Sequence, residues 1–281
     1  MFLQDLLIGG SSAIFSRTLT APLELFKLQR QNSFMPHSTL RAVLKIEGPR
    51  YLWKGNGVNC LRACPQVSVN YAVFEYSKTN IFSDVESKPA QNFLAGAVSG
   101  CTALCCMYPL ETLRSRLSLQ TSHNHYLSIN DAFQKMTFRD MYKGLRMSLL
   151  GFGPYNALNF SSYFYLTRQF EQLSIEKNVQ KLLAGGLSGL GAVSITYPSD
   201  LIRRRLQLQG FDKSVPPYQG IRDCISKVIR DEGVKGLYRG LLATYIKLFP
   251  TTAIQFWFLD LCNDKLKKRI GLLFKLVLFY F

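Results

Sequence analysis

The sequence predicts an all-α membrane protein with six transmembrane helices, arranged as three repeats with pseudo-threefold symmetry. Three stretches, 89–110, 147–167 and 182–199, contain no Asp, Glu, Lys or Arg. As helices that rise about 1.5 Å per residue, they are about long enough to cross a hydrocarbon core of about 30 Å. A motif built on a proline also recurs three times at nearly constant spacing, which indicates an internal repeat.

The composition of the chain indicates which classes of partner and activity are favoured. The 281 residues carry a formal net charge of +16, with a pI near 9.6. This charge favours an anionic partner such as nucleic acid, acidic lipid or an anionic solute, and a generally basic soluble surface is the alternative. The 7 cysteines form no CxxC pair, and no paired carboxylates, nucleophile motif or metal-ligand spacing is present. The sequence therefore predicts no enzyme, metal site or cofactor site.

Each repeat carries a proline, an acid two residues later and a base five residues later. The motif reads APLELFKLQ, YPLETLRSR and YPSDLIRRR, and its prolines are Pro22, Pro109 and Pro198. An aromatic residue, a base and a glycine follow in each repeat, and these triplets are Trp53, Lys54 and Gly55; Tyr142, Lys143 and Gly144; and Tyr238, Arg239 and Gly240. The shared register divides the chain into repeats at 1–85, 86–174 and 175–281.

Each repeat is expected to hold two spanning helices joined by a short amphipathic helix, at 39–46, 129–137 and 220–230. A proline inside the first spanning helix kinks it, because proline removes one backbone hydrogen bond. Charged side chains are tolerated at membrane depth when they face a cavity and have a partner. The proline motifs are therefore predicted to bend three helices inward and to turn their charges away from lipid.

The triplicated motif and its triplets resemble those of the mitochondrial carrier family, over residues 3–269. A single copy would be weak evidence, whereas three copies in one register are specific. The resemblance implies a six-helix barrel that crosses the mitochondrial inner membrane several times, with the short amphipathic helices on the matrix side. It also implies a monomer that carries an anionic solute by alternating access and performs no catalysis.

On the matrix side, the resemblance implies a gate in which the acid of one repeat pairs with the base of the next. The expected pairs are Glu24 with Arg114, Glu111 with Arg203, and Asp200 with Lys27. Gln29 takes the place of a glutamine brace beneath such a pair. Because breaking a buried pair costs roughly 3–5 kcal/mol, the gate is expected to open only when bound solute supplies comparable contacts.

On the cytosolic side, the resemblance implies a second gate whose motif is incomplete. Glu75 and Lys78 match the motif, but Phe164 stands at the acid position of the second repeat and Asn263 at the basic position of the third. Asp260 and Lys78 are the one pair that remains, so weak closure is expected on this side. A degenerate protein that does not transport is the alternative.

The solute site implied by the resemblance combines positive charge with a flat, partly aromatic surface. Its phosphate-binding candidates are Arg17, Arg62 and Lys247. Its candidates for an adenine pocket are Gly151, Phe152, Tyr155 and Thr196, with Asn70 as a further polar residue. Helix packing is the alternative role for the two aromatic residues. The constellation resembles adenine nucleotide carriers, and coenzyme A and thiamine pyrophosphate are the alternative solutes.

The three triplets also resemble the cardiolipin sites of the family. Free amides at a helix N-terminus and a nearby base suit a lipid phosphate, so bound cardiolipin is implied at all three. A basic nucleic-acid-binding protein is the less favoured alternative, because many of the bases follow prolines at membrane depth. No nucleic acid is therefore expected among the partners.

Overall fold

A computed structural model of the chain describes residues 2–32, 44–45, 47–120, 126, 128–172, 177–210, 217–248, 250–251 and 254. This part of the chain is helical and contains no strand, which confirms the predicted all-α class. The long helices are α1 (Phe2–Gln31), α3 (Asn56–Tyr76), α4 (Lys88–Leu119), α7 (Leu145–Glu171) and α8 (Lys177–Leu208). Residues 241–248 begin a further helix after η3.

Short elements connect the long helices. They are the 3-10 helices η1 (Pro49–Trp53) and η3 (Val234–Tyr238), the π-helical turn η2 (Ser77–Ile81), and the helices α5 (Ile129–Lys135), α6 (Phe138–Met141) and α9 (Ile221–Glu232). Two of the three predicted amphipathic connections therefore form, as α5 and α9. The first, at 39–46, lies almost wholly outside the described residues.

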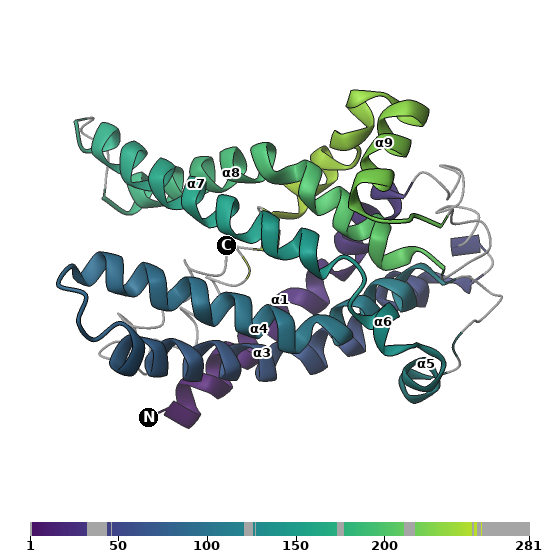
Figure 1. The fold of residues 1–281 in the computed structure, drawn as a ribbon, viewed down its shortest axis with the longest axis horizontal. Coiled ribbons are helices and arrows are strands. Elements are labelled where there is room, and N and C mark those ends of the chain that lie inside the picture. The colour runs from purple at the N-terminus through teal and green to yellow at the C-terminus, as the bar shows by residue number, and fades with distance from the viewer. Residues whose placement is uncertain are drawn as a thin grey trace.

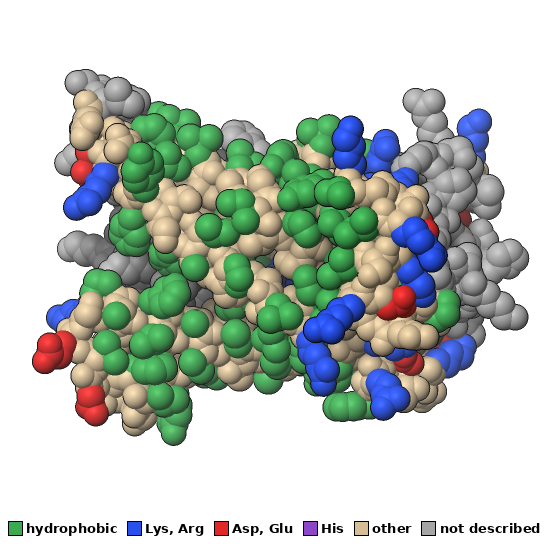
Figure 2. All heavy atoms as spheres, turned by 45° about the horizontal axis from the view of Figure 1, so that its top comes forward, with side chains coloured by type: hydrophobic (Ala, Val, Ile, Leu, Met, Phe, Trp, Pro, Cys, Tyr) green, Lys and Arg blue, Asp and Glu red, His purple; other side chains and the backbone are tan. Residues whose placement is uncertain are grey.

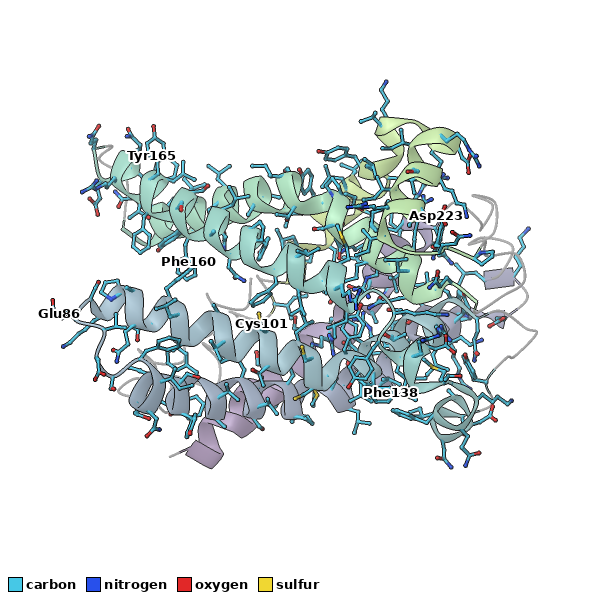
Figure 3. The ribbon with its side chains drawn as sticks, viewed as in Figure 1. Glu86, Cys101, Phe138, Phe160, Tyr165 and Asp223 are labelled. Atoms are coloured by element: carbon cyan, nitrogen blue, oxygen red, sulfur yellow. The ribbon has the colours of Figure 1, made fainter. Side chains whose placement is uncertain are left out.

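The long helices form two packed pairs, α3 with α4 and α7 with α8, while α1 packs on α3 (Figure 1). The C-terminal parts of α1, α4 and α8 gather at one end of the molecule, beside α5, α6 and α9. Figure 3 places Asp223 of α9 at this end and Glu86 at the opposite one. The ends that follow the three proline motifs are therefore brought together.

Pro22 lies inside α1 and leaves one carbonyl group of that helix without its usual partner. The carbonyl four residues earlier belongs to Thr18, and the indole nitrogen of Trp53 donates to it at 2.9 Å. The aromatic residue of the first triplet thus satisfies the backbone at the proline kink. This contact also fixes the turn before α3 against α1.

The second and third repeats link the same two segments through a tyrosine that precedes the proline. The Tyr108 hydroxyl donates to the Lys143 carbonyl at 3.1 Å, and the Tyr197 hydroxyl donates to the Arg239 carbonyl at 3.0 Å. The first repeat has Ala21 at this position. All three repeats therefore join the kink to the triplet. In the first repeat the triplet supplies the donor, whereas in the other two the proline-containing helix supplies it.

The glycine of each triplet packs against the proline-containing helix of another repeat. Gly55, Gly144 and Gly240 have φ angles of 82°, 87° and 90°, a region that favours glycine. A Cβ atom on Gly55 would meet Ser118 and the Arg114 carbonyl of α4; one on Gly144 would lie 2.9 Å from the Arg203 carbonyl of α8. Gly240 lies in the same way against Gln31 of α1. Each turn therefore needs glycine for its backbone angle and for the close approach.

The outer surface is consistent with a membrane environment. Among the described residues, α4 is the one helix that is long and apolar enough to span a bilayer, with a mean hydropathy of 1.6 over its best window. Gly, Ser, Thr, Asn and Tyr lower the hydropathy of α7 and α8, as expected where helices pack closely. Hydrophobic side chains cover the middle of the face in Figure 2, and Lys and Arg gather toward one end. Large apolar residues such as Leu150, Ile195 and Leu242 are exposed on the surface.

Candidate functional site

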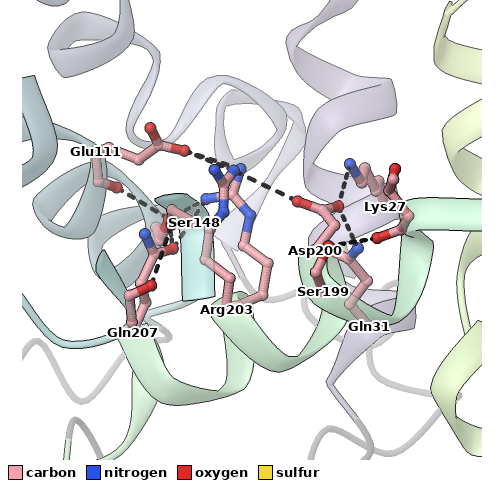
Figure 4. Close-up of polar contacts among 12 residues, drawn as sticks. Lys27, Gln31, Glu111, Ser148, Ser199, Asp200, Arg203 and Gln207 are labelled. Carbon is pink, nitrogen blue, oxygen red and sulfur yellow. Dashed lines mark hydrogen bonds and ion pairs between the residues drawn. The ribbon is translucent and has the colours of Figure 1, made fainter. Parts of the chain in front are cut away.

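Three acid–base pairs join the convergent ends of α1, α4 and α8, as Figure 4 shows for two of them. The distances are 2.9 Å for Lys27 with Asp200, 3.2 Å for Arg114 with Glu24, and 3.0 Å for Arg203 with Glu111. Every predicted partner thus lies within ion-pair distance of its acid. Because the pairs connect α8 to α1, α1 to α4, and α4 to α8, they close a circle, which we call the ion-pair ring.

Two of the three acids of the ring are buried, whereas the side chain of Asp200 is 26% exposed. Glu24 is 6% exposed and Glu111 is 5% exposed. Desolvation offsets much of the attraction in such pairs, so the ring adds little net stability over apolar packing. Loss of a single partner is far more harmful, because it leaves a buried charge without compensation. A charged residue of the ring can therefore change its partner, but it cannot stay buried without a partner of opposite charge.

Glu111 is held by three arginines rather than by one. Arg62 of α3 lies 2.6 Å from one carboxylate oxygen, while Arg203 and Arg204 lie 3.0 and 3.2 Å from the other. The sequence predicts Arg203 in this position, and it assigns Arg62 to the solute. Arg204 carries no signal in the sequence beyond its place in an arginine run. Its role is visible only once α8 is packed on α4.

Glu24, like Glu111, is shared by more than one base, and the second is Lys247. Its ammonium group forms an ion pair with Glu24, which also holds Arg114. We call the ion-pair ring together with Arg62, Arg204 and Lys247 the charge cluster. Among the described residues the cluster contains six bases and three acids, a formal excess of three positive charges.

The structure separates the predicted phosphate-binding residues into two groups. Arg62 and Lys247 belong to the charge cluster and contact two different acids of the ring. Arg17 lies against α3 instead, and its guanidinium group donates to the Asn59 carbonyl at 2.9 Å. The two bases at the ring are thus brought together by the fold, whereas Arg17 is held by a helix contact.

Two residues of the predicted adenine pocket, Gly151 and Phe152, pack against neighbouring helices. The sequence predicts that Gly151 leaves room for a flat ring, but the space in front of it is filled by the Ser199 side chain of α8. The ring of Phe152 lies directly against Gly100 of α4, where a Cβ atom would clash with it. Gly151 therefore serves a close approach of α7 to α8, which sequence spacing alone does not reveal.

The other predicted solute residues make few contacts that define a pocket. Thr196 donates its hydroxyl to the Ala192 carbonyl of its own helix at 2.8 Å. Tyr155 is half-buried. Asn70 is 7% exposed, and its side-chain oxygen has no hydrogen-bond partner among the described residues. Asn70 therefore stays a candidate whose polar atom is buried and unpaired among the described residues.

The glutamine brace is Gln31 rather than Gln29. Gln31 donates to Asp200 at 3.0 Å and to the Tyr197 hydroxyl at 3.1 Å, whereas Gln29 lies beside Tyr51. The reason is helical geometry, because residues four apart share a face and residues two apart do not. Gln31 follows Lys27 by four positions, so it reaches the acid that Lys27 holds. That spacing is the signal by which the sequence could have identified it.

Replacement of Gln31 by leucine is expected to lower the free energy of unfolding by about 1–3 kcal/mol, because the buried acceptors on α8 lose their donor. Replacement of Gln29 by leucine, the matched control, removes no donor to Asp200 and is expected to cost less than the Gln31 change. Unfolding of the detergent-purified variants by heat measures both. Equal losses for the two glutamines would contradict the assignment.

The bases of the three triplets are each paired with a nearby acid. Lys54 lies 3.1 Å from Glu47, Lys143 lies 2.6 Å from Asp140, and Arg239 lies 3.2 Å from Glu232. The second repeat lacks the acid–glycine pair found before the other triplets, and Asp140 supplies its carboxylate. Gly55 and Gly144 cap the N-termini of α3 and α7. The free amides of these two helices are thus placed at the triplets.

The second predicted gate is described only in part. Lys78 lies with its ammonium group 5.8 Å from the centre of the Phe74 ring, at the end of α3. Asp260 lies outside the described residues, so its pairing with Lys78 stays a prediction, as does a gating role for Glu75. On the same side, Phe160 of α7 packs edge-to-face on Phe93 of α4 with ring centres 6.2 Å apart, and Figure 3 shows Phe160 directed toward α4.

The fold and the site define a helical membrane protein of three repeats whose kinked helices are joined at one end by ion pairs. A sequence profile of the family described as "Mitochondrial carrier protein" matches residues 1–85, 85–173 and 175–270. The chain belongs to the mitochondrial carrier family. It is accordingly a multi-pass protein of the mitochondrial inner membrane, and proteins of this family are transporters.

Individual relatives cover most of the chain. Mitochondrial substrate carrier family protein P of Dictyostelium discoideum is 34% identical over 89% of this chain and 90% of its own length. The mitochondrial adenine nucleotide transporter ADNT1 of Arabidopsis thaliana is 31% identical over 94% of this chain and 87% of its own. The mitochondrial carrier protein CoAc1 of Zea mays is 30% identical over 93% and 86%.

Proposed function

We propose that this protein exchanges an adenine nucleotide, or a related phosphate-bearing cofactor, across the mitochondrial inner membrane by alternating access. The observation that carries the proposal is the charge cluster, in which six bases meet three acids. A buried excess of positive charge is unfavourable unless an anion compensates it. An anionic solute would supply that compensation, and the similarity to an adenine nucleotide transporter supports the nucleotide class.

In this proposal the three repeats, 1–85, 86–174 and 175–281, form a pseudo-threefold barrel of six spanning helices around the solute. The ion-pair ring is its matrix-side gate. Two contacts support an exchange of partners at the ring: Arg62 shares Glu111 with Arg203, and Lys247 shares Glu24 with Arg114. A phosphate group can take Arg62 and Lys247, since both acids keep a second base. A guanidinium fork suits bidentate phosphate contact, and the ammonium acts as a point charge.

Coenzyme A is the second candidate solute, because it carries an adenosine unit with several phosphate groups. The similarity to the protein named CoAc1 favours it, and both solutes suit the same bases. The placement of these bases between helices, with Arg62 only 8% exposed, favours a small solute over nucleic acid. We further propose that the protein works as a monomer and that cardiolipin binds at the triplets, where helix N-termini offer amides to its phosphates.

Exchange by the purified protein in cardiolipin-containing vesicles tests the proposal. Vesicles loaded with unlabelled nucleotide are expected to take up labelled ATP or ADP, or labelled coenzyme A, in a saturable manner. Arg62→Ala and Lys247→Ala are expected to lose this uptake. Arg230→Ala, on the solvent side of α9 with a side chain that is 77% exposed, is the matched control and is expected to retain it. Absence of saturable uptake for all these anions, with folded protein in the vesicles, would refute the proposed function.

A further inference from the structure

We infer that Arg204 sets the charge of the solute, so that the protein prefers anions with three or more negative charges. This inference rests on the proposed function and deepens it, because it names the charge class of the solute. It concerns a residue that is neither the proline, the acid nor the base that define the motif, and that is not part of a triplet. The argument depends on the contacts of Arg204, on its place among the repeats and on the charge balance of the cluster.

Arg204 is buried and firmly placed. It is 5% exposed, and one of its terminal nitrogens lies 3.2 Å from Glu111. The other donates to the Ser115 hydroxyl at 2.8 Å and to the Gln207 side chain at 3.0 Å. The guanidinium group therefore lies between α4 and α8, directly beside the ion-pair ring.

The other two repeats have no base at the equivalent position. One residue after the base of the motif stands Leu28 in the first repeat and Ser115 in the second. Two of the three pairs of the ring, those of Lys27 and Arg114, form without a cation there. Closure of the ring therefore does not require Arg204. Its charge is an addition that the third repeat alone provides.

Arg204 makes it easier for Arg62 to leave Glu111. If a phosphate group takes Arg62, the carboxylate keeps both Arg203 and Arg204, so the contact between α4 and α8 stays paired. Without Arg204, Glu111 would retain Arg203 alone, and that arginine also lies 3.4 Å from Asp200. Arg62 would then be needed by the carboxylate and would be less available to the solute.

Arg204 also accounts for one of the three excess positive charges of the cluster. Charges act over long distances in a weakly polar interior, so a solute just above the ring experiences the total charge beneath it. A solute with about three or four negative charges balances the excess, as ADP, ATP and coenzyme A would, whereas AMP carries about two. Thiamine pyrophosphate has a cationic ring that lowers its net charge. The inference therefore favours the adenosine polyphosphates over thiamine pyrophosphate.

The test compares AMP, ADP and ATP as labelled solutes for the full-length protein in vesicles. In the wild type, kcat/KM is expected to rise with the charge of the nucleotide. In Arg204→Gln, which keeps a side chain able to bond to Ser115, the ratio of kcat/KM for ATP to that for AMP is expected to fall by about tenfold or more. Arg204→Lys keeps the charge and is expected to keep most of the ratio. The protection that each nucleotide gives against thermal unfolding in detergent measures the same preference without transport.

A control separates the charge of Arg204 from its hydrogen bond. Ser115→Ala removes the bond partner but no charge, so it is expected to keep the ATP-to-AMP ratio, whatever its effect on the rate. An unchanged ratio in Arg204→Gln, or an equal loss in Ser115→Ala, would overturn this inference while leaving the proposed function intact. If the wild type carries no nucleotide of the series and no coenzyme A, the proposed function itself fails, and this inference with it.

Discussion

Replacement of Glu111 by glutamine is expected to abolish exchange and to lower the free energy of unfolding by about 3–5 kcal/mol, the range for breaking a buried ion pair. Glu111 is the acid that Arg62, Arg203 and Arg204 share, and it is 5% exposed. A neutral amide cannot compensate three guanidinium groups. The convergent ends of α3, α4 and α8 would then repel one another, so the ion-pair ring would open.

Two measurements check this expectation. Thermal unfolding in detergent reports the stability, and nucleotide exchange in vesicles reports the function. Glu86→Gln is the matched control, because Glu86 is an exposed acid at the opposite end of the molecule. It is expected to behave as the wild type in both measurements. If Glu111→Gln melted and transported as the wild type does, the triple contact at Glu111 would have no importance for closure.

Replacement of Gly55 by alanine is expected to destabilise the protein by more than about 1–2 kcal/mol, the usual cost of a left-handed backbone for a residue with a side chain. Its φ angle is 82°, and a Cβ atom would lie 3.1 Å from the Arg114 carbonyl and would strike the Ser118 hydroxyl. Both neighbours belong to α4. The added methyl group would therefore push the turn before α3 away from the helix that carries Arg114, and the Glu24 pair would be strained.

Gly57 provides the control for this change. It lies two residues later inside α3, and a Cβ atom there would meet nothing within 4 Å. Gly57→Ala is expected to be neutral or to raise the free energy of unfolding by about 0.4–1 kcal/mol, because alanine loses less conformational freedom on folding. The two variants should be compared by thermal unfolding in one detergent. Similar melting temperatures would show that the close approach of the turn to α4 is not needed.

The sequence predicted those features that are written in local spacing. An acid and a base three positions apart share one face of a helix, which turns the charges of each proline motif to one side. The pairing of Glu24, Glu111 and Asp200 with bases of other repeats was implied by the family resemblance, and the three ion pairs are present in the structure. The same periodicity applied to Lys27 indicates Gln31, which donates to Asp200 in the structure, whereas the sequence prediction named Gln29. The class of fold followed from the repeated motif and the uncharged stretches.

Features that depend on contacts between repeats could not be predicted in this way. The third arginine on Glu111 and the filling of the space at Gly151 by Ser199 both arise where α8 packs on its neighbours. No periodic pattern within one helix contains that information. The double use of Arg62 is a related case, because a base that suits a phosphate suits a carboxylate equally well. Only the fold shows which anion is in reach.

The placement of the triplet glycines has a consequence for biogenesis. Gly55 packs on α4, Gly144 on α8 and Gly240 on α1. The triplet of each repeat therefore packs on the next repeat, and the triplet of the third packs on the first. During synthesis, α1 must wait for the C-terminal third of the polypeptide before its end acquires Gly240 and Asp200 as neighbours. Such distant partnerships slow folding and leave early segments open to wrong associations. A nascent chain that stops after two units would therefore lack the contacts that Gly240 and Asp200 make with the end of its first helix.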